Sequence, residues 1–252
     1  SIWGSSNLPV HPLYSPEHFL MGKADLFSMR LTWLGHACFC LEGSRTILID
    51  PFIPEDSLSV EPDIVAVTHA HADHLGIAAE LSKKTVAVNE VAKYLRSKGV
   101  PTEPMNIGGS ITVDGVQFTM TPALHSSWLE DEGMGFYGGA AAGFVIAMDG
   151  ISVYHAGDTA LFSDMQLIRD LYRPDVALLP VGGRFTMGPD EAMIAARYTG
   201  ARLVIPMHYD TFPAIRQDLQ NFKQAIERTT AIRVRILSPA ESIEIGPESP
   251  ET

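Results

Sequence analysis

Cysteine is nearly absent from this chain of 252 residues, because Cys38 and Cys40 are the only two. They stand two positions apart, so in a strand both would point to one face and a disulfide between them would be badly strained. A disulfide scaffold and a cysteine-based metal site are therefore disfavoured. We expect two reduced core thiols, in keeping with a cytoplasmic location.

Long apolar runs and positive charge are also scarce. No apolar stretch approaches the ~18 residues that span a bilayer, and no basic start with an apolar core marks a secretory signal. Lys and Arg number 18 against 30 Asp and Glu, which gives a formal net charge of −12. Because polyanions are bound by clustered Lys and Arg, we expect no nucleic-acid partner, and no membrane partner either.

Histidine, by contrast, is concentrated in one place. The chain has nine histidines, and the segment "VTHAHADHLG" holds His69, His71 and His74 together with Asp73. The preceding "DIVAV" is typical of a buried strand, and we expect a helix from Leu75. In extended chain, residues i and i+2 face the same way, so His69 and His71 can bind one cation and Asp73 continues that face. This density of ligands favours two metal ions a few ångströms apart over one.

The remaining ligands must come from distant parts of the chain, because a closed metal site needs more donors than this segment supplies. Four candidates each follow a predicted strand, and they are Asp50 after "TILI", His125 after "FTMTPAL", Asp158 after "SVYHAG" and His208 after "LVIPM". Strand ends that meet at one edge of a fold are typical of a catalytic rim.

The order of predicted elements gives the architecture. Strands dominate the first half, and helices alternate with strands in the second, so two packed sheets covered by helices are expected. Helices are predicted over 75–82, 90–98 and 162–172, from Pro189, and from Pro213 to about Arg228. We divide the chain into an N-terminal arm or added extension (1–28), one domain (29–246) and a tail (247–252).

Seven motifs carry a resemblance to a known family. They are "LGHACF", "ILIDPF", "THAHADHLG", "ALHSS", "HAGDT", "FTMGPDEA" and "PMHYDTFP". In this order and spacing they resemble the metallo-β-lactamase superfamily, in particular its branch of metal-dependent hydrolases related to L-ascorbate-6-phosphate lactonase. The resemblance covers Met29 to about Ile245. It implies the four-layer αββα sandwich of the metallo-β-lactamase fold.

The resemblance also implies roles for the candidate residues. His69, His71 and His125 would bind a first metal ion, Asp73, His74 and His208 a second, with Asp158 between them. Asp50 and Asp73 would be the catalytic carboxylates, Asp73 as proton acceptor and Asp50 either orienting the site or contacting the substrate. His71 is not replaced by the Glu of redox di-iron relatives, which favours hydrolysis.

Several further residues are candidates for contact with a substrate. Arg184 could bind an anionic group, Trp128, Phe136 and Tyr137 could make apolar contacts, and Tyr209 and Thr211 could reach a leaving group. His36 is either at the rim or a packed core residue, and His155 either supports a ligand or packs in its strand. The glycine-rich stretch around Gly138, Gly139 and Gly143 could form a flexible hood.

The sequence therefore predicts a cytoplasmic hydrolase with two divalent ions, Zn or Mn with Fe as a third option, because mixed imidazole and carboxylate ligands suit all three. Its substrate would be a small-molecule ester, lactone or phosphoester, and a homo-oligomer is an option. The alternatives are a nuclease or phosphodiesterase of the same superfamily, and a non-catalytic metal-binding module.

Overall fold

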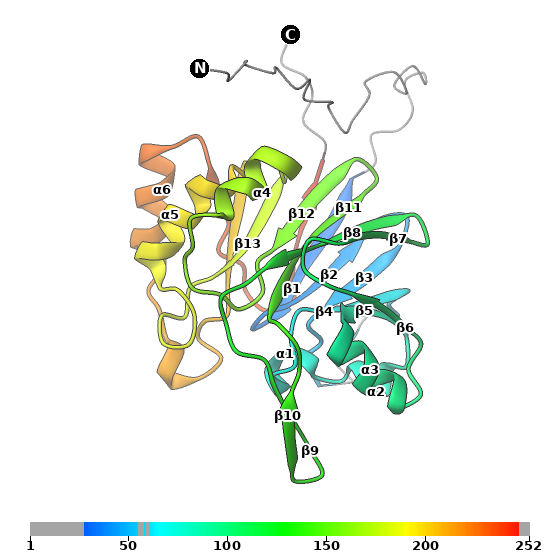
Figure 1. Cartoon of the computed structure of the whole chain (residues 1–252). Coiled ribbons are helices and arrows are strands. Elements are labelled where there is room, and N and C mark those ends of the chain that lie inside the picture. Colours follow the sequence, from blue (N-terminus) through cyan, green and yellow to red (C-terminus); the bar gives the residue numbers. More distant parts are fainter. Residues whose placement is uncertain (1–27, 55–57, 59–60, 247–252) are drawn as a thin grey trace, which may run out of the picture.

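The computed structural model describes residues 28–54, 58 and 61–246, so the expected arm before Ser28 and the expected tail lie outside the described residues. The described chain forms two seven-stranded sheets and a separate two-stranded hairpin (Figure 1).

The first sheet is mixed. In spatial order its strands are β16 (Glu241–Ile245), β1 (Met29–Gly35), β2 (Cys38–Glu42), β3 (Thr46–Ile49), β4 (Ile64–Val67), β5 (Lys84–Val88) and β6 (Thr102–Met105). Pairing is antiparallel from β16 to β3 and parallel from β3 to β6. The four residues of β4 are all buried, as expected for a strand covered on both faces.

The second sheet repeats this mixture. In spatial order its strands are β15 (Arg233–Val234), β14 (Leu203–Met207), β13 (Val176–Pro180), β12 (Ile151–His155), β11 (Ala142–Met148), β8 (Val116–Pro122) and β7 (Ser110–Val113). Pairing is parallel from β12 to β15 and antiparallel from β7 to β12. The turns at Asp114-Gly115 and Asp149-Gly150 have positive φ, as the Asp-Gly pairs predict.

Helices cover the outer faces of both sheets. The bounds are α1 (Ala72–Leu75), α2 (Ala78–Leu81), α3 (Asn89–Ser97), α4 (Met165–Tyr172), α5 (Pro189–Thr199) and α6 (Gln220–Thr229), with a 3₁₀ turn, η3, at Pro213–Ile215. Helix α3 packs on β5 and β6, whereas α5 packs on β13 and α6 on β15. Figure 1 shows α4, α5 and α6 on one side and α1 to α3 on the other. The predicted αββα sandwich is confirmed.

The core lies between the two sheets. It contains fully buried aromatic side chains from both, including Phe39 of the first sheet and Phe118, Phe144 and Tyr154 of the second. The inner faces of the two sheets therefore exclude water and hold the strands rigidly, which fixes where each strand ends. Cys38 and Cys40 are free and buried in a smaller cluster with Leu48 on the other face of the first sheet, so the expected reduced thiols are confirmed.

The helix predicted from Leu75 to Ser82 is wrong in its bounds. The chain becomes helical earlier, at Ala72, and breaks at Gly76, where φ is +45°. A Cβ atom on Gly76 would lie 2.0 Å from the carbonyl oxygen of Pro51, so glycine permits this close approach. As a result Asp73 lies in a helical turn and not on the extended face that it was expected to share with His69 and His71.

Two other expectations also need correction. The helix predicted from Pro213 to Arg228 is interrupted, because only η3 and α6 are helical and residues 216–219 are not. The glycines expected in a flexible hood are buried, Gly138 and Gly139 between β10 (Met134–Tyr137) and β11, and Gly143 within β11. Ahead of them, β10 pairs only with β9 (Trp128–Asp131) and forms a hairpin that the sequence did not predict. In Figure 1 this hairpin projects from the body of the molecule. No helix in the described part of the chain is long and apolar enough to cross a membrane.

Candidate metal centre

The candidate ligands follow strands whose carboxyl ends meet at one edge of the sandwich. Asp50 follows β3, the His69 segment follows β4, His125 follows β8, Asp158 follows β12 and His208 follows β14. In a mixed sheet the carboxyl ends of parallel neighbours lie side by side, so side chains far apart in the sequence meet there. The structure brings the His69 segment, His125, Asp158 and His208 together at this edge, and Asp50 joins them through its contact with His74.

One group of donors contains His69, His71 and His125. Their nearest ligand atoms lie within 4.8 Å of one another, and Nε2 of His69 is 3.0 Å from Nδ1 of His71. The backbone N–H of Ala70, between the two, donates to Oγ of Ser127 over 3.1 Å. This bond ties the His69–His71 segment to the chain that follows His125. Three imidazoles in this arrangement are a donor set that suits Zn and related ions.

A second group lies beside the first. His36, Asp73, His74 and His208 also offer atoms within 4.8 Å of one another. Asp73 and His74 enter this group because helix α1 turns them away from the extended segment before it. The Nε2 atom of His208 lies 3.8 Å from Oδ2 of Asp73. Each of the two groups could hold a metal ion.

Asp158 lies between the two groups. Its Oδ2 atom is 3.5 Å from Nε2 of His125, 3.3 Å from Nε2 of His74 and 2.9 Å from Nε2 of His208. One carboxylate oxygen therefore faces an imidazole of the first group and two of the second. This is the position that a ligand shared by two metal ions requires.

Metal ions fit a site well where buried polar atoms have no hydrogen-bond partner in the protein, and this centre contains such atoms. Among the described residues they include Nε2 of His74, Oδ1 of Asp158, and both Nδ1 and Nε2 of His208. An unpaired buried polar atom is costly, so natural structures rarely keep several in one place. Of these atoms, Nε2 of His74 and Nε2 of His208 both lie within 3.3 Å of the Asp158 carboxylate, and imidazole and carboxylate ligands together suit Zn, Mn or Fe. The donor set therefore fits divalent metal ions.

Asp50 holds two of these histidines in one orientation. Its carboxylate accepts hydrogen bonds from Nδ1 of His74 over 2.7 Å and from N and Oγ1 of Thr68 over 2.8 and 2.7 Å. Because the Thr68 hydroxyl donates to Asp50, it accepts from Nδ1–H of His69 at 3.0 Å. Both imidazoles thus keep Nε2 free for a metal ion. Asp50 is fully buried, which favours the first of the two expectations for it, a residue that orients the site, over contact with a substrate.

His36 holds Asp73 from the other side. Its Nε2 atom is 3.1 Å from Oδ2 of Asp73 and its Nδ1 atom is 2.9 Å from Oγ1 of Thr211. Its carbonyl oxygen accepts the backbone N–H of His208 over 2.9 Å. The side chain is only 1% exposed. Of the two expectations for His36, the burial and these bonds favour a packed residue that supports Asp73 and His208, and its contact with a substrate stays a prediction.

Three residues at this edge have left-handed backbones. The φ angles of His36, Asp50 and His208 are +51°, +46° and +57°. For non-glycine residues this conformation costs roughly 1–2 kcal/mol each. Each follows or ends a strand, so the positive φ turns the chain sharply and directs the side chain into the site. Backbone strain concentrated in this way is typical of functional sites.

The electrostatics of the centre follow from burial and from the two buried carboxylates. Burial, aided by the nearby His74, lowers the pKa of His69 well below its ordinary value. Burial would lower the pKa of His74 as well, but Asp158 and Asp50 outweigh it and raise that pKa well above 6.5. In turn His74 and His208 outweigh burial and hold the pKa of Asp158 well below its usual range. The hydrogen bond from His36 similarly overcomes burial and lowers the pKa of Asp73 to about 2.

His155 does not touch a candidate ligand. Its Nε2–H donates to the carbonyl oxygen of Ala37 over 2.9 Å, and its Nδ1 accepts the backbone N–H of Gly157 over 3.1 Å. The ring thus joins the β1–β2 turn to the turn that carries Asp158. Burial lowers its pKa, which keeps the ring neutral and both bonds intact. Of the two expectations for His155, a packed residue that fixes the backbone next to a ligand describes it best.

The structure places the residues expected to contact a substrate in different surroundings. Tyr209 turns away from the centre and stacks on Trp33, with ring centroids 5.4 Å apart, so it packs the fold and that expectation is corrected. Arg184 is exposed and lies over the Phe185 ring, in a loop tied to Thr159 by the Met187 N–H. Trp128 and Tyr137 are exposed partners across the β9–β10 hairpin. Contacts of these three with a substrate stay predictions.

Comparison with known proteins agrees with this geometry. The model of the beta-lactamase superfamily domain matches residues 30–208. A UPF0173 metal-dependent hydrolase of Methanoculleus marisnigri is 86% identical over 220 residues, which cover 87% of this chain and 98% of that protein. Another from Methanospirillum hungatei is 64% identical over 217 residues, 86% of this chain and 99% of that protein.

Among solved structures, the metallo hydrolase Igni18 from the hyperthermophilic archaeon Ignicoccus hospitalis is similar with a TM-score of 0.79 and 38% identity, over 86% of this chain and 98% of that one. Fold and donor set together define a metal-dependent hydrolase of the metallo-β-lactamase superfamily. Within that class, the chain belongs to the UPF0173 metal-dependent hydrolase family.

Proposed function

We propose that this protein uses two divalent metal ions, Zn or Mn with Fe as a third option, to hydrolyse an ester, lactone or phosphoester of a small molecule in the cytoplasm. The observation that carries the proposal is the place of Asp158 Oδ2, within 3.5 Å of imidazole nitrogens from both donor groups. His69, His71 and His125 would hold one ion, and Asp73, His74 and His208 the other.

Two bound metal ions would lower the pKa of a water molecule between them and stabilise negative charge that develops on the substrate. Orienting the water and moving its proton would fall to the chain's own residues. Asp73 is the most exposed carboxylate of the centre, with 32% of its side chain accessible, so it faces the side from which a substrate enters. Its low pKa keeps it ionised, so it would orient the attacking water, accept the proton that the water loses, and pass that proton on to the leaving group.

The rim of the centre supports a substrate with an apolar part. Leu124 and Phe212 are 55% and 42% exposed. Leu124 immediately precedes His125, and the Phe212 ring lies 5.7 Å from that of His36. Apolar side chains beside a polar centre are typical of small-molecule sites. They favour an uncharged ester or lactone over a nucleic acid, which a rim of Lys and Arg would attract.

The proposal is tested by metal analysis and a substrate screen. Protein purified without added ions is measured by plasma mass spectrometry, and assayed with lactones, p-nitrophenyl esters and bis(p-nitrophenyl) phosphate. We expect about two ions per chain and turnover of at least one substrate class. Loss of turnover by at least about a hundredfold is expected in His71→Ala and Asp158→Asn. Asp170→Asn, on the exposed face of α4, is the matched control and should keep full activity.

Other outcomes would favour the two alternatives. Cleavage of bis(p-nitrophenyl) phosphate and RNA with steep salt dependence, and none of neutral esters, would replace the proposal with a nuclease. A lower melting temperature in both ligand variants, with no turnover of any substrate by the unaltered protein, would replace it with a binding module.

A further inference from the structure

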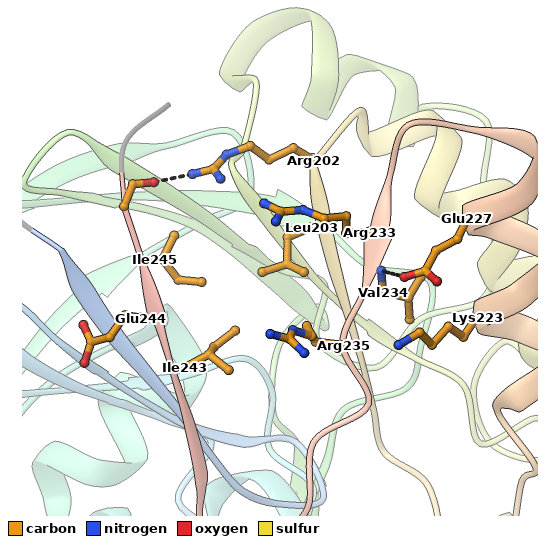
Figure 2. Close-up of a pocket in the computed structure, with 11 residues that line it drawn as sticks. Arg202, Leu203, Lys223, Glu227, Arg233, Val234, Arg235, Ile243, Glu244 and Ile245 are labelled. Atoms are coloured by element: carbon orange, nitrogen blue, oxygen red, sulfur yellow. Dashed lines mark hydrogen bonds between the residues drawn. The ribbon is translucent and has the colours of Figure 1, made fainter. Parts of the chain in front are cut away.

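A cavity lies at the opposite end of strand β14 from the metal centre. It encloses about 420 Å³ between β15, β16 and α6, and Figure 2 shows its lining. Leu203, at the start of β14, lines it, whereas His208 follows the other end of the same strand. At about 3.3 Å per residue these two positions are roughly 16 Å apart. The cavity is therefore separate from the hydrolytic site.

Positive side chains surround this cavity. Arg233 and Arg235 come from the β15 segment two residues apart, Lys223 comes from α6, and Arg202 precedes β14. In Figure 2 Arg233 and Arg235 extend from the β15 segment toward β16, and Lys223 approaches from α6 on the other side of that segment. Arg202 is bonded to Asp175 and to the carbonyl oxygen of Gly246, so it closes the rim.

The two carboxylates of the lining do not neutralise these cations. Glu227 accepts the backbone N–H of Val234 over 3.0 Å, and Glu244 pairs with Arg30 at 3.0 Å on the other side of β16. Within the described part of the chain, Arg233, Arg235 and Lys223 form no ion pair within 4.0 Å. In a protein of net charge −12, three cations without an ion pair among the described residues line one cavity, and such a local positive potential attracts anions.

The walls between the cations are apolar. Leu203, Val234, Ile243 and Ile245 line the cavity, and Val234 and Ile245 are almost fully buried. A cavity of 300–1,000 Å³ with an apolar floor and a few polar groups is typical of small-ligand sites. Guanidinium groups match phosphate oxygens in a bidentate way, and they suit phosphate better than a lone carboxylate when several converge.

We propose that this cavity binds a small organic phosphate of nucleotide size, with its phosphates on Arg233, Arg235 and Lys223 and its apolar part on the Ile243 and Ile245 side. The opposing interpretation is that the arginines only protect the short edge strand β15 from pairing with another chain. That role needs charge but no ligand, so binding distinguishes the two.

The test is isothermal titration of the metal-loaded protein with α,β-methylene-ADP, which resists cleavage between its phosphates. We expect one molecule bound per chain, weaker binding as salt is raised, and much weaker binding of adenosine. Arg233→Gln/Arg235→Gln should weaken binding at least about tenfold, because it removes two charged hydrogen-bond donors. Both positions are exposed, and an unchanged melting temperature would show that the variant is folded.

Two controls locate the binding. Arg216→Gln/Arg228→Gln changes the same net charge at exposed positions outside the cavity and should leave the affinity unchanged. His71→Ala alters the metal centre and should leave it unchanged too, whatever the fate of hydrolysis. The proposal is overturned if the ligand does not bind at millimolar concentration, if both double variants weaken it equally, or if only His71→Ala abolishes binding.

Discussion

Replacing Asp50 with Asn should weaken metal binding without altering the shape of the site. Asn has the size of Asp and tolerates the left-handed backbone at this position, where φ is +46°. The carboxylate accepts three hydrogen bonds, from His74 and from N and Oγ1 of Thr68. An amide has one acceptor oxygen, and its NH₂ group would face at least one of these donors. His74 would lose one of its two carboxylate partners, keeping Asp158, and part of its basicity as a ligand.

The magnitude follows from that loss. Changing a group that orients a metal ligand typically costs 10–100-fold in metal affinity or activity, which is about 1.4–2.8 kcal/mol. The unpaired donor left beside the amide should also lower the free energy of unfolding by about 1–3 kcal/mol. Because Asp50 is fully buried, we expect kcat to fall and KM to change little.

The assay combines competition with a chromogenic chelator and steady-state kinetics on the substrate found by the screen. The matched control is Asp63→Asn, because Asp63 also accepts a backbone N–H, that of Thr46, but is exposed. It should leave affinity and kcat unchanged. Unaltered metal affinity in Asp50→Asn, together with a KM raised more than tenfold, would refute the positioning role and make Asp50 a substrate contact.

Three further predictions concern neighbouring features. His36→Ala should lower kcat by at least about tenfold, because the hydrogen bond from His36 to Asp73 is lost, and Thr211→Val should lower kcat less. Equal kcat values for the unaltered protein and both variants in steady-state assays would contradict this. In metal-free protein the raised pKa of His74 keeps its imidazole protonated as pH rises through 6.5, so metal binding at pH 7 should release a proton, and metal affinity should fall as pH falls. Calorimetry in buffers of different ionisation enthalpy measures the number of protons released. That number should be smaller in Asp158→Asn, because Asp158 is one of the carboxylates that raise the pKa of His74. Gly76→Ala should lower the free energy of unfolding, measured in urea, by at least about 2 kcal/mol, since a Cβ atom would meet the Pro51 oxygen at 2.0 Å. At Gly99 a Cβ atom would meet nothing within 4 Å, so Gly99→Ala should cost only the roughly 1–2 kcal/mol of its positive φ.

Sequence reasoning succeeded where a residue of the site follows the end of a strand. Asp50, His125, Asp158 and His208 each follow a run of β-forming residues, and such runs in a mixed sheet have few places to end except its two edges. Predicting where the strands end therefore comes close to predicting where the site lies. The same reasoning placed His69 and His71 together, because side chains two residues apart in an extended chain point to the same face.

The sequence failed where the backbone departs from regular conformations. Nothing in "LGHACF" indicates that His36 adopts a positive φ and turns toward Asp73, a contact between residues 37 positions apart. Asp73 itself was assigned to an extended segment, because the helical start at Ala72 depends on the packing of Gly76 against Pro51. The β9–β10 hairpin was missed for a similar reason, since the four residues of β10 are all exposed and give no alternating apolar pattern.

These failures share one physical origin, and it bears on how the centre works. Left-handed residues and short helical turns are set by tertiary packing, which overrides local propensity. At this edge the overriding contacts are the polar ones: Asp50 with Thr68 and His74, His36 with Asp73 and Thr211, and His155 with Ala37 and Gly157. Each fixes an imidazole or the backbone beside a ligand before any metal ion binds. The donor atoms are therefore preorganised, and the strain stored in His36, Asp50 and His208 is the cost of directing them to one centre.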